Sequence, residues 1–294
     1  MNIISIGEVL WDVFEDAEHI GGATFNFCAH AARLGHDVSF VSAVGRDELG
    51  RRAIKRTEEL GLSTEFIRET DEHPTGYVSV FVDSEGQPDF TIHRPAAYDF
   101  PQLDDGQFEK LSEQNADWIY FGTLFLMGDQ ARSLTERVLG ALPTAQRIYD
   151  INLRKESYTP ALIHELLGLA TILKINDEEV FAVRKMSGEA QTTLEGFARE
   201  YADRFGLEGV CITKGSAGCS ILLEDEFVEV AGYPVEVADA VGAGDAFTAA
   251  FVHGLGGRWS PEQIGDFANR VGALVASRSG AVPDWTLEEA EALG

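Results

Sequence analysis

The chain contains the stretch Asp239-Ala240-Val241-Gly242-Ala243-Gly244-Asp245, which runs directly into Ala246-Phe247-Thr248-Ala249-Ala250-Phe251. Two glycines separated by one alanine allow a sharp bend, here placed after a strand near Val237, and bring backbone N–H groups close to a ligand. The apolar run is typical of a buried helix that begins at about Gly242. Because the unpaired N–H groups and the positive dipole end of such a helix converge, the stretch predicts a site for an anion such as a phosphate.

Asp245 falls in the first turn of this helix, where a carboxylate has two uses. The commoner use is to cap the helix or to offset its dipole. The other is to act on a bound ligand. A short glycine pattern alone favours capping, because such patterns often arise by chance. The other motifs of the chain favour a role in ligand chemistry.

The same stretch resembles the C-terminal signature of the ribokinase-like (PfkB-type) carbohydrate kinases, whose usual form is Asp-Thr-x-Gly-Ala-Gly-Asp. Here Ala240 replaces the threonine. In that family the last aspartate is the catalytic base, and the Gly-Ala-Gly backbone binds the transferring phosphoryl group. The resemblance therefore implies that Asp245 is the base and that Gly242, Ala243 and Gly244 form the anion hole.

The composition indicates a cytoplasmic protein with a sizeable core. The 294 residues are 45% apolar, and no apolar run is long enough to span a membrane. The first residues form a short strand pattern without a basic flank, so we expect no export. Cys28, Cys211 and Cys219 show no CxxC spacing, so we expect neither a disulfide framework nor a zinc site.

The formal net charge of −26 excludes two classes of partner. Such a surface repels nucleic acids and anionic membranes, so we expect neither as a partner. It also opposes the binding of ATP, whose phosphate charge must be offset by groups at the site itself. Helix N-termini, a divalent metal and a few cationic side chains must offset the phosphate charge against an unfavourable overall field.

Strand and helix patterns alternate along most of the chain. This alternation predicts an α/β fold, a doubly wound and mainly parallel sheet flanked by helices, in a single domain over 1–294. Strands are predicted at 3–6, 38–44, 118–121, 147–150, 171–175, 209–213 and 219–223. Helices are predicted within 22–35 and at about 47–60, 107–114, 129–142, 193–205, 242–255 and 261–278.

One region departs from this alternation. Residues 75–99 contain two apolar strand patterns around the turn Asp83-Ser84-Glu85-Gly86, which predicts a β-hairpin. We interpret it as part of a small β-sheet inserted at about 11–22 and 68–99. In the family that the chain resembles, such a sheet is a lid over the sugar and often the dimer surface, which implies a homodimer formed through the lid.

A second glycine turn, Gly21-Gly22, precedes a helix of small residues. Together with Asn26 it resembles the N-terminal signature of the same kinases, which implies that Gly22, Asn26 and Asp12 contact sugar hydroxyls. Carboxylates and amides are the side chains that bind hydroxyl groups with paired hydrogen bonds. Taken alone, Asn26 would be an ordinary helix or capping residue and Asp12 a solvated charge at a strand end.

Two arginines are further candidates for substrate binding. The segment Ile92–Asp99 resembles the fructokinase and 2-keto-3-deoxygluconate kinase branch, in which Arg94 faces the substrate. The alternative is a surface arginine paired with a neighbouring acid. Arg154 ends Asp150-Ile151-Asn152-Leu153-Arg154, whose polar residues would share one face of an extended segment at the carboxyl end of a strand. This segment resembles the family's Asp-x-Asn-x-Arg, which implies that Arg154 contacts substrate or phosphate.

The segment Lys174-Ile175-Asn176-Asp177-Glu178-Glu179 resembles the family's Asn-x-x-Glu element. The resemblance implies that Asn176 and Glu179 organise Mg²⁺ and its water around ATP. One carboxylate acting partly through water is enough, because Mg²⁺ takes few protein ligands. The same two residues also fit the capping box of a helix start, and both interpretations can hold together.

Other residues are implied on the nucleotide side by the same resemblance. A Thr-x-Gly-x-x-Gly turn places Thr213, Gly215 and Gly218 beside the nucleotide, although it also fits an ordinary hairpin turn. Asn269 lies where the family lines its adenine pocket. Asp239, with backbone near Val241 and Gly280, matches the family's monovalent-cation (K⁺) site, whose usual threonine is replaced here by Ala240.

These motifs follow the family's order over nearly the whole chain, and competing signatures fail. No GxxxxGK[ST] is present, and Phe247 stands where a dinucleotide GxGxxG needs its last glycine. We therefore expect an ATP-dependent kinase that phosphorylates a primary hydroxyl of a small sugar. Fructose is the first choice, from the Gly7–Asp12 start and the Arg94 segment, with 2-keto-3-deoxygluconate or ribose as alternatives. A non-catalytic sugar or nucleotide sensor on the same fold is the other class, which the intact Gly-Ala-Gly-Asp disfavours.

Overall fold

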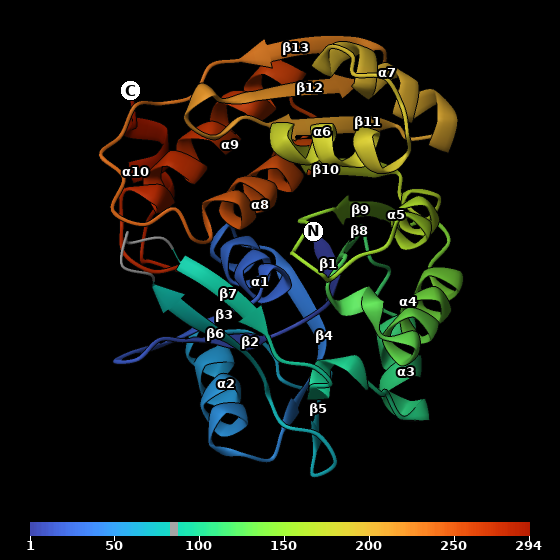
Figure 1. The fold of residues 1–294 in the computed structure, drawn as a ribbon, viewed down its shortest axis with the longest axis vertical. Helices are drawn as coiled ribbons and strands as arrows, with labels where there is room; N and C mark the ends of the chain where they lie inside the picture. Colours follow the sequence, from blue (N-terminus) through green and yellow to red (C-terminus); the bar gives the residue numbers. More distant parts are fainter. Residues whose placement is uncertain (83–87) are drawn as a thin grey trace.

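The computed structural model describes residues 1–82 and 88–294, so the turn of the expected hairpin, 83–87, lies outside the described residues. Two sheets are present (Figure 1). The larger has nine strands in the order β13-β12-β11-β10-β9-β8-β1-β4-β5, and the smaller has four in the order β3-β2-β6-β7. Pairing in the large sheet is parallel except for β11–β12 and β12–β13. The mainly parallel α/β architecture expected from the sequence is confirmed.

The strands are β1 (Asn2–Ile6), β2 (Leu10–Val13), β3 (Glu18–Gly21), β4 (Asp37–Gly45), β5 (Ile67–Thr70), β6 (Gly76–Val82), β7 (Pro88–Ile92), β8 (Trp118–Gly122), β9 (Gln146–Asp150), β10 (Ile172–Asn176), β11 (Gly209–Thr213), β12 (Cys219–Leu223) and β13 (Glu226–Val230). The helices are α1 (Ala23–Arg33), α2 (Glu48–Glu59), α3 (Asp105–Ser112), α4 (Asp129–Ala141), α5 (Pro160–Leu167), α6 (Asp177–Met186), α7 (Leu194–Phe205), α8 (Ala243–Gly256), α9 (Pro261–Ala276) and α10 (Leu287–Ala292).

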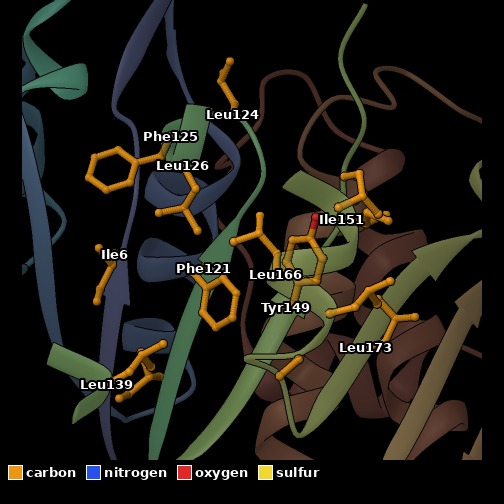
Figure 2. Close-up of a cluster of buried hydrophobic side chains, with 14 of the residues drawn as sticks. Ile6, Phe121, Leu124, Phe125, Leu126, Leu139, Tyr149, Ile151, Leu166 and Leu173 are labelled. Carbon is orange, nitrogen blue, oxygen red and sulfur yellow. The ribbon is translucent and has the colours of Figure 1, made fainter. Parts of the chain in front are cut away.

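Helices cover both faces of the large sheet, so its central strands are apolar on both sides. Side chains along β1 alternate between two cores: Ile4 and Ile6 pack in the layer that includes α3 to α7. Ile3 faces the layer of α1, α8 and α9. Figure 2 shows the first layer, in which Ile6, Phe121 and Tyr149 project from neighbouring strands. This packing fixes the carboxyl ends of the parallel strands along one edge.

Helix α8 begins where the glycine pattern predicts, with Gly242 as its N-cap residue at φ 79°. The strand expected near Val237 is absent: residues 231–241 form neither helix nor strand, and Val237 is exposed. The N–H groups of Ala238 and Asp239 instead donate to the Ala276 carbonyl, at 2.9 and 3.2 Å. The approach to the turn is therefore held by the end of α9 and not by sheet pairing.

The small sheet contains the expected hairpin strands β6 and β7, which pair antiparallel. β2 pairs parallel with β6 and antiparallel with β3, which joins residues 10–21 to the hairpin. Residues 67–70 do not join this sheet, because β5 pairs with β4 at the edge of the large one. The Trp11 indole N–H donates to the Leu49 carbonyl at 3.0 Å, which holds the small sheet against α2.

Within residues 1–82 and 88–294, no helix combines the length and apolarity needed to cross a bilayer. The three cysteines are buried free thiols, and burial raises the pKa of the Cys28 and Cys219 thiols to about 12. They are therefore uncharged at neutral pH.

Candidate active site

The turn at Gly242 depends on a close approach between two backbone segments. A Cβ atom at Gly242 would lie 2.2 Å from the Ala281 carbonyl oxygen, so no side chain fits at this position. The same oxygen accepts from His30 Nε2 at 3.0 Å, while His30 Nδ1 accepts from the Trp285 indole at 3.1 Å. Burial lowers the pKa of His30 to about 4, which keeps this buried ring neutral. A neutral histidine from α1 thus fixes the loop that supports the turn.

Asp245 lies in the first turn of α8, as predicted, and is buried. Its Oδ2 atom accepts a hydrogen bond from Asn26 Nδ2 of α1 at 2.8 Å, across 219 residues of sequence. Burial raises the pKa of Asp245 to about 7, with the Asn26 hydrogen bond acting in the opposite direction. No described residue bonds to the second carboxylate oxygen. A carboxylate with a free oxygen and a pKa near neutrality has the properties of a general base.

The first turn of α8 also presents unpaired amides. The Ala243 N–H donates to the Ala240 carbonyl at 3.3 Å, a long hydrogen bond. The Gly244 and Asp245 N–H groups, by contrast, find no acceptor among the residues that the structure describes. These two N–H groups therefore remain available to an anion beside the Asp245 carboxylate.

Three buried polar side-chain atoms lack a partner on the segments that carry the expected sugar-binding residues. Glu8 Oε2, Asn26 Oδ1 and the Tyr98 hydroxyl have no hydrogen-bond partner within the described chain. Buried polar atoms are normally paired, so these mark a place where a polar ligand can supply the missing bonds. Glu8 was not among the sequence candidates. Its Oε1 atom accepts from the Ala23 N–H at 3.0 Å, and a Cβ atom at Gly22 would lie 2.6 Å from its carbonyl oxygen.

Arg154 is exposed, and its charge acts on two predicted acids, Asp12 and Asp245, and on Glu8. The guanidinium group acts to lower the pKa of Glu8, of Asp12 and of Asp245, although burial leaves all three raised. These carboxylates therefore lie within electrostatic reach of one cation. Four of the predicted substrate and catalytic residues, Asp12, Asn26, Arg154 and Asp245, are thus brought to one region.

The segment that carries Arg154 is not extended, so its polar residues do not share one face. β9 ends at Asp150, and Asn152 adopts a left-handed φ of 36°. Asp150 is fully buried, whereas Arg154 is exposed. The expectation of a single polar face is wrong because a left-handed residue breaks the period-2 alternation of a strand.

Arg94 lies against Tyr98, with its guanidinium carbon 5.6 Å from the centroid of that ring. Its guanidinium group pairs with Asp99 and donates to the Leu124 carbonyl at 2.9 Å, which is the ion-paired alternative considered from the sequence. It lines a cavity of about 590 Å³ together with residues 95, 99, 100 and 128–130. Within the described chain, no hydrogen bond links Arg94 to Asp245 or Asn26.

Asn176 and Glu179 form the predicted capping box of α6. Asn176 Oδ1 accepts from the Glu179 N–H at 2.8 Å, and Glu179 Oε2 accepts from the Asn176 N–H at 2.9 Å. Glu179 Oε1 accepts from the Leu153 N–H at 2.7 Å, which ties this helix start to the segment after β9. Burial raises the pKa of Glu179. The capping interpretation is confirmed. Each Glu179 carboxylate oxygen accepts one hydrogen bond from the described residues, which leaves it one lone pair.

The residues expected to bind the nucleotide lie near strands β11, β12 and β13 of the large sheet. A Cβ atom at Gly218, which has φ 96°, would lie 2.1 Å from the Val230 carbonyl oxygen. Asn269 of α9 donates to the Val230 and Ala231 carbonyls at 3.3 and 3.1 Å. Gly218 and Asn269 therefore meet the same backbone segment. Thr213 ends β11, and Gly215 begins the short turn between it and Gly218.

Asp239 bridges the two segments expected for a cation site. Its Oδ1 atom accepts from the Val241 N–H at 3.0 Å and its Oδ2 atom from the Gly280 N–H at 3.1 Å. In the part of the chain that the structure describes, no group of three His, Cys, Asp or Glu side chains is arranged to hold a metal ion.

These features match a known family. A family model described as pfkB family carbohydrate kinase matches residues 4–287, which is nearly the whole chain. The chain belongs to this family. It is therefore a carbohydrate kinase, a phosphotransferase whose acceptor is a sugar hydroxyl, and the turn at Gly242 lies within the matched region.

Known proteins resemble this kinase over most of their length. A fructokinase of Salmonella typhimurium is 27% identical over 304 residues, which cover 94% of each chain. An uncharacterized sugar kinase from Pyrococcus horikoshii, solved in complex with ATP, has a TM-score of 0.82 at 26% identity, with 99% of each chain covered. A 2-dehydro-3-deoxygluconokinase from Thermotoga maritima has a TM-score of 0.86 at 20% identity, over 99% of this chain and 98% of that one. At 20% identity, the likeness to the Thermotoga maritima enzyme shows a shared fold only.

Proposed function

We propose that this carbohydrate kinase transfers the γ-phosphoryl group of ATP to a primary hydroxyl of fructose. The observation that supports it most is at the start of α8, where one Asp245 carboxylate oxygen and two first-turn amides have no hydrogen-bond partner among the described residues. The 27% identical fructokinase supports fructose, and the sugar kinase solved with ATP supports the phosphoryl donor. The fold alone does not select the sugar.

In the proposed reaction Asp245 accepts a hydrogen bond from the acceptor hydroxyl through its free oxygen. It takes the proton as the hydroxyl oxygen bonds to the γ-phosphorus in line, while the bond from that phosphorus to the β–γ bridging oxygen breaks and ADP leaves with the bond's electron pair. The Gly244 and Asp245 amides, with the Gly242–Gly244 turn that aims them, stabilise charge on the equatorial phosphoryl oxygens. Asn26 orients the carboxylate, because its amide group occupies the other oxygen at 2.8 Å.

The ATP site proposed from the sequence comprises Asn176, Thr213, Gly215, Gly218 and Asn269. Thr213 and Asn176 end the neighbouring parallel strands β11 and β10, so they share the edge on which open α/β sheets bind ligands. Gly218 and Asn269 enclose the backbone at Val230. Mg²⁺ bound to the triphosphate would offset its charge in this acidic chain.

Glu179 fits a divalent ion held mainly by phosphate oxygens and water. Both of its oxygens already accept one backbone N–H, so a direct and exclusive ligand role does not suit it. A free lone pair on each oxygen suits a contact through water. For Asp239, the carboxylate between the Val241 and Gly280 amides supports a monovalent-cation site, for which we propose K⁺.

A coupled ADP-release assay tests the proposed substrate. The panel is fructose, 2-keto-3-deoxygluconate, ribose, adenosine and fructose phosphates. We expect fructose to have the highest kcat/KM. A clear preference for another sugar would overturn fructose as the substrate but leave the kinase activity in place. Binding of sugar or ATP without ADP release on any member of the panel would favour the alternative of a non-catalytic sensor. Sugar-independent ATP hydrolysis as fast as phosphorylation would contradict the lid role expected for the small sheet, since a lid over the sugar excludes water.

Glu8→Gln is expected to raise the sugar KM by roughly tenfold, about 1.4 kcal/mol, because an acceptor oxygen facing the substrate becomes a donor. Its Oε1 atom, which caps the Ala23 N–H, is kept, so α1 should remain in place. The measurement is kcat and KM for fructose and for monodeoxy sugars. One deoxy sugar should be insensitive to the substitution, since it lacks the hydroxyl that Glu8 binds.

Gln146→Met is the matched control for Glu8. Gln146 Oε1 is also buried without a partner among the described residues, but it begins β9 at the opposite edge of the sheet. Its replacement should leave the sugar KM unchanged. Equal KM changes in both variants, or none in Glu8→Gln, would contradict a sugar contact for Glu8.

We also propose a homodimer formed through the small sheet. Phe81 and Phe90 on β6 and β7 are 70% and 50% exposed, and large exposed aromatic side chains favour protein–protein contacts. Light scattering should give twice the chain mass for the wild type and a smaller mass for Phe81→Ser/Phe90→Ser. Phe181→Ser on α6 is the control, because this ring is 55% exposed away from the sheet. A monomeric wild type would contradict the proposal.

A further inference from the structure

A buried ion pair lies beneath the turn that begins α8. Lys174 of β10 is 6% exposed, and its Nζ atom lies 3.2 Å from the carboxylate of Asp150 at the end of β9. Asp150 is fully buried. Neither residue had an individual role in the sequence prediction, although each lies in a motif.

The pair is linked to the turn by a chain of short contacts. The Thr248 hydroxyl lies 3.2 Å from Asp150 Oδ2 and 2.8 Å from the Gly244 carbonyl oxygen. It has one proton to donate, so it hydrogen-bonds to one of these two acceptors at a time. The Tyr120 hydroxyl donates to the same Asp150 oxygen at 3.3 Å. A Cβ atom at Gly244 would lie 3.7 Å from Lys174 Nζ, which places the ammonium group directly against the turn.

Stability alone is a poor explanation for such a pair. Taking both charges out of water costs several kcal/mol each, and apolar residues of similar size often replace buried ion pairs without loss of stability. The location offers a better explanation. In a chain with a net charge of −26, a fixed cation against the phosphoryl-binding turn supplies local positive charge.

The two charges act on Asp245 in opposite directions. Lys174 acts to lower the pKa of this carboxyl, and Asp150 acts to raise it. The other groups that face Asp245 are Asn26 of α1, which lowers its pKa by hydrogen bonding, and Arg154, which lowers it by charge. Tyr120 of β8 lies within reach of the Asp245 charge, but burial holds its phenol neutral.

We propose that Lys174 and Asp150 form one positioning unit for phosphoryl transfer. Asp150 fixes the Lys174 ammonium group against Gly244 in the first turn of α8, and Lys174 supplies a cation beneath the first-turn amides. The inference rests on the proposed role of Asp245 as base. It adds two residues that act through the turn and do not touch the sugar.

Lys174→Met and Asp150→Asn test the unit by their pH profiles. Both are expected to lower kcat by about ten- to a hundredfold with a smaller change in the sugar KM, since they disturb the transition-state amides and not the sugar pocket. The acid-side loss of kcat/KM should move to higher pH in Lys174→Met and to lower pH in Asp150→Asn. Opposite shifts show that both charges act on Asp245, and a fall in kcat that persists at a pH where Asp245 is ionised in every variant shows a further effect on the phosphoryl-binding turn.

Arg184→Met is the matched control. Arg184 of α6 is equally buried and pairs with Glu200 at 2.7 Å and with Glu189, away from the turn. Its loss should lower the thermal midpoint and leave kcat and the pH profile unchanged. If Lys174→Met and Asp150→Asn behave like Arg184→Met, or shift the profile in the same direction, the positioning unit is refuted. Wild-type-like turnover by Asp245→Asn would instead refute the base, which separates the two failures.

Discussion

Asp245→Asn is expected to lower kcat for sugar phosphorylation by about 10²- to 10⁴-fold, the usual contribution of a general base. The amide has nearly the shape of the carboxylate and can still bond to Asn26, but it cannot take a proton from the acceptor hydroxyl. The α8 amides are unchanged, so ATP should bind almost as before. Steady-state ADP release and calorimetric titration with ATP measure the two effects separately.

Asp47→Asn is the control for this prediction. Asp47 is a helix-capping aspartate, whose carboxylate accepts from the Gly50 N–H and the Thr75 N–H at 2.8 Å each. It stands for the ordinary role that Asp245 would have if it only capped α8. Asp47→Asn should change stability and leave kcat alone. If Asp245→Asn does the same, Asp245 is a capping residue and the proposed mechanism is wrong.

Gly242→Ala is expected to abolish most turnover, with a fall in kcat of at least about 10²-fold, as for the loss of an oxyanion-hole donor. Left-handed backbone costs an alanine about 1–2 kcal/mol. The added Cβ atom would also lie 2.2 Å from the Ala281 carbonyl oxygen, so the turn must move. A shift of the turn misdirects the first-turn amides and Asp245 together. Thermal unfolding and kcat report the two consequences.

Gly61→Ala is the control for Gly242→Ala, because it introduces the same backbone strain without a steric clash. Gly61 has φ 76°, almost that of Gly242, but no atom within 4 Å of the added carbon. It follows α2, away from the turn. We expect Gly61→Ala to lower the free energy of unfolding only by the cost of placing an alanine in left-handed backbone, and to leave kcat unchanged. Equal effects of the two substitutions would contradict the claim that the Gly242–Ala281 contact holds the turn.

The sequence predicts the parts of this site that local backbone chemistry determines. Gly242 needs a positive φ and a close approach, which only glycine provides, and the apolar run behind it is a helix. The capping box formed by Asn176 and Glu179 was predicted correctly because both partners lie within four residues. The strand alternation likewise gave the mainly parallel sheet, since buried strands have a regular apolar pattern.

Contacts that depend on tertiary packing could not be predicted in this way. Thr248 meets Asp150 across 98 residues, and nothing in either local pattern indicates the pairing. Glu8 is identified only by an orphan oxygen that appears once the chain is folded. β5 and β13 were missed because such short edge strands are defined by their neighbours β4 and β12. The strand expected near Val237 does not form, because the N–H groups of Ala238 and Asp239 donate to the Ala276 carbonyl of α9.

The most direct measurement of the base assignment is the pH dependence of kcat/KM for the best sugar. With the pKa of Asp245 raised to about 7, the unprotonated fraction should fall tenfold for each pH unit below that value. The wild-type rate should therefore decline on the acid side with a midpoint near pH 7. A rate that stays level from pH 8 down to about pH 5, where a carboxyl of ordinary pKa is still ionised, would contradict a buried Asp245 base.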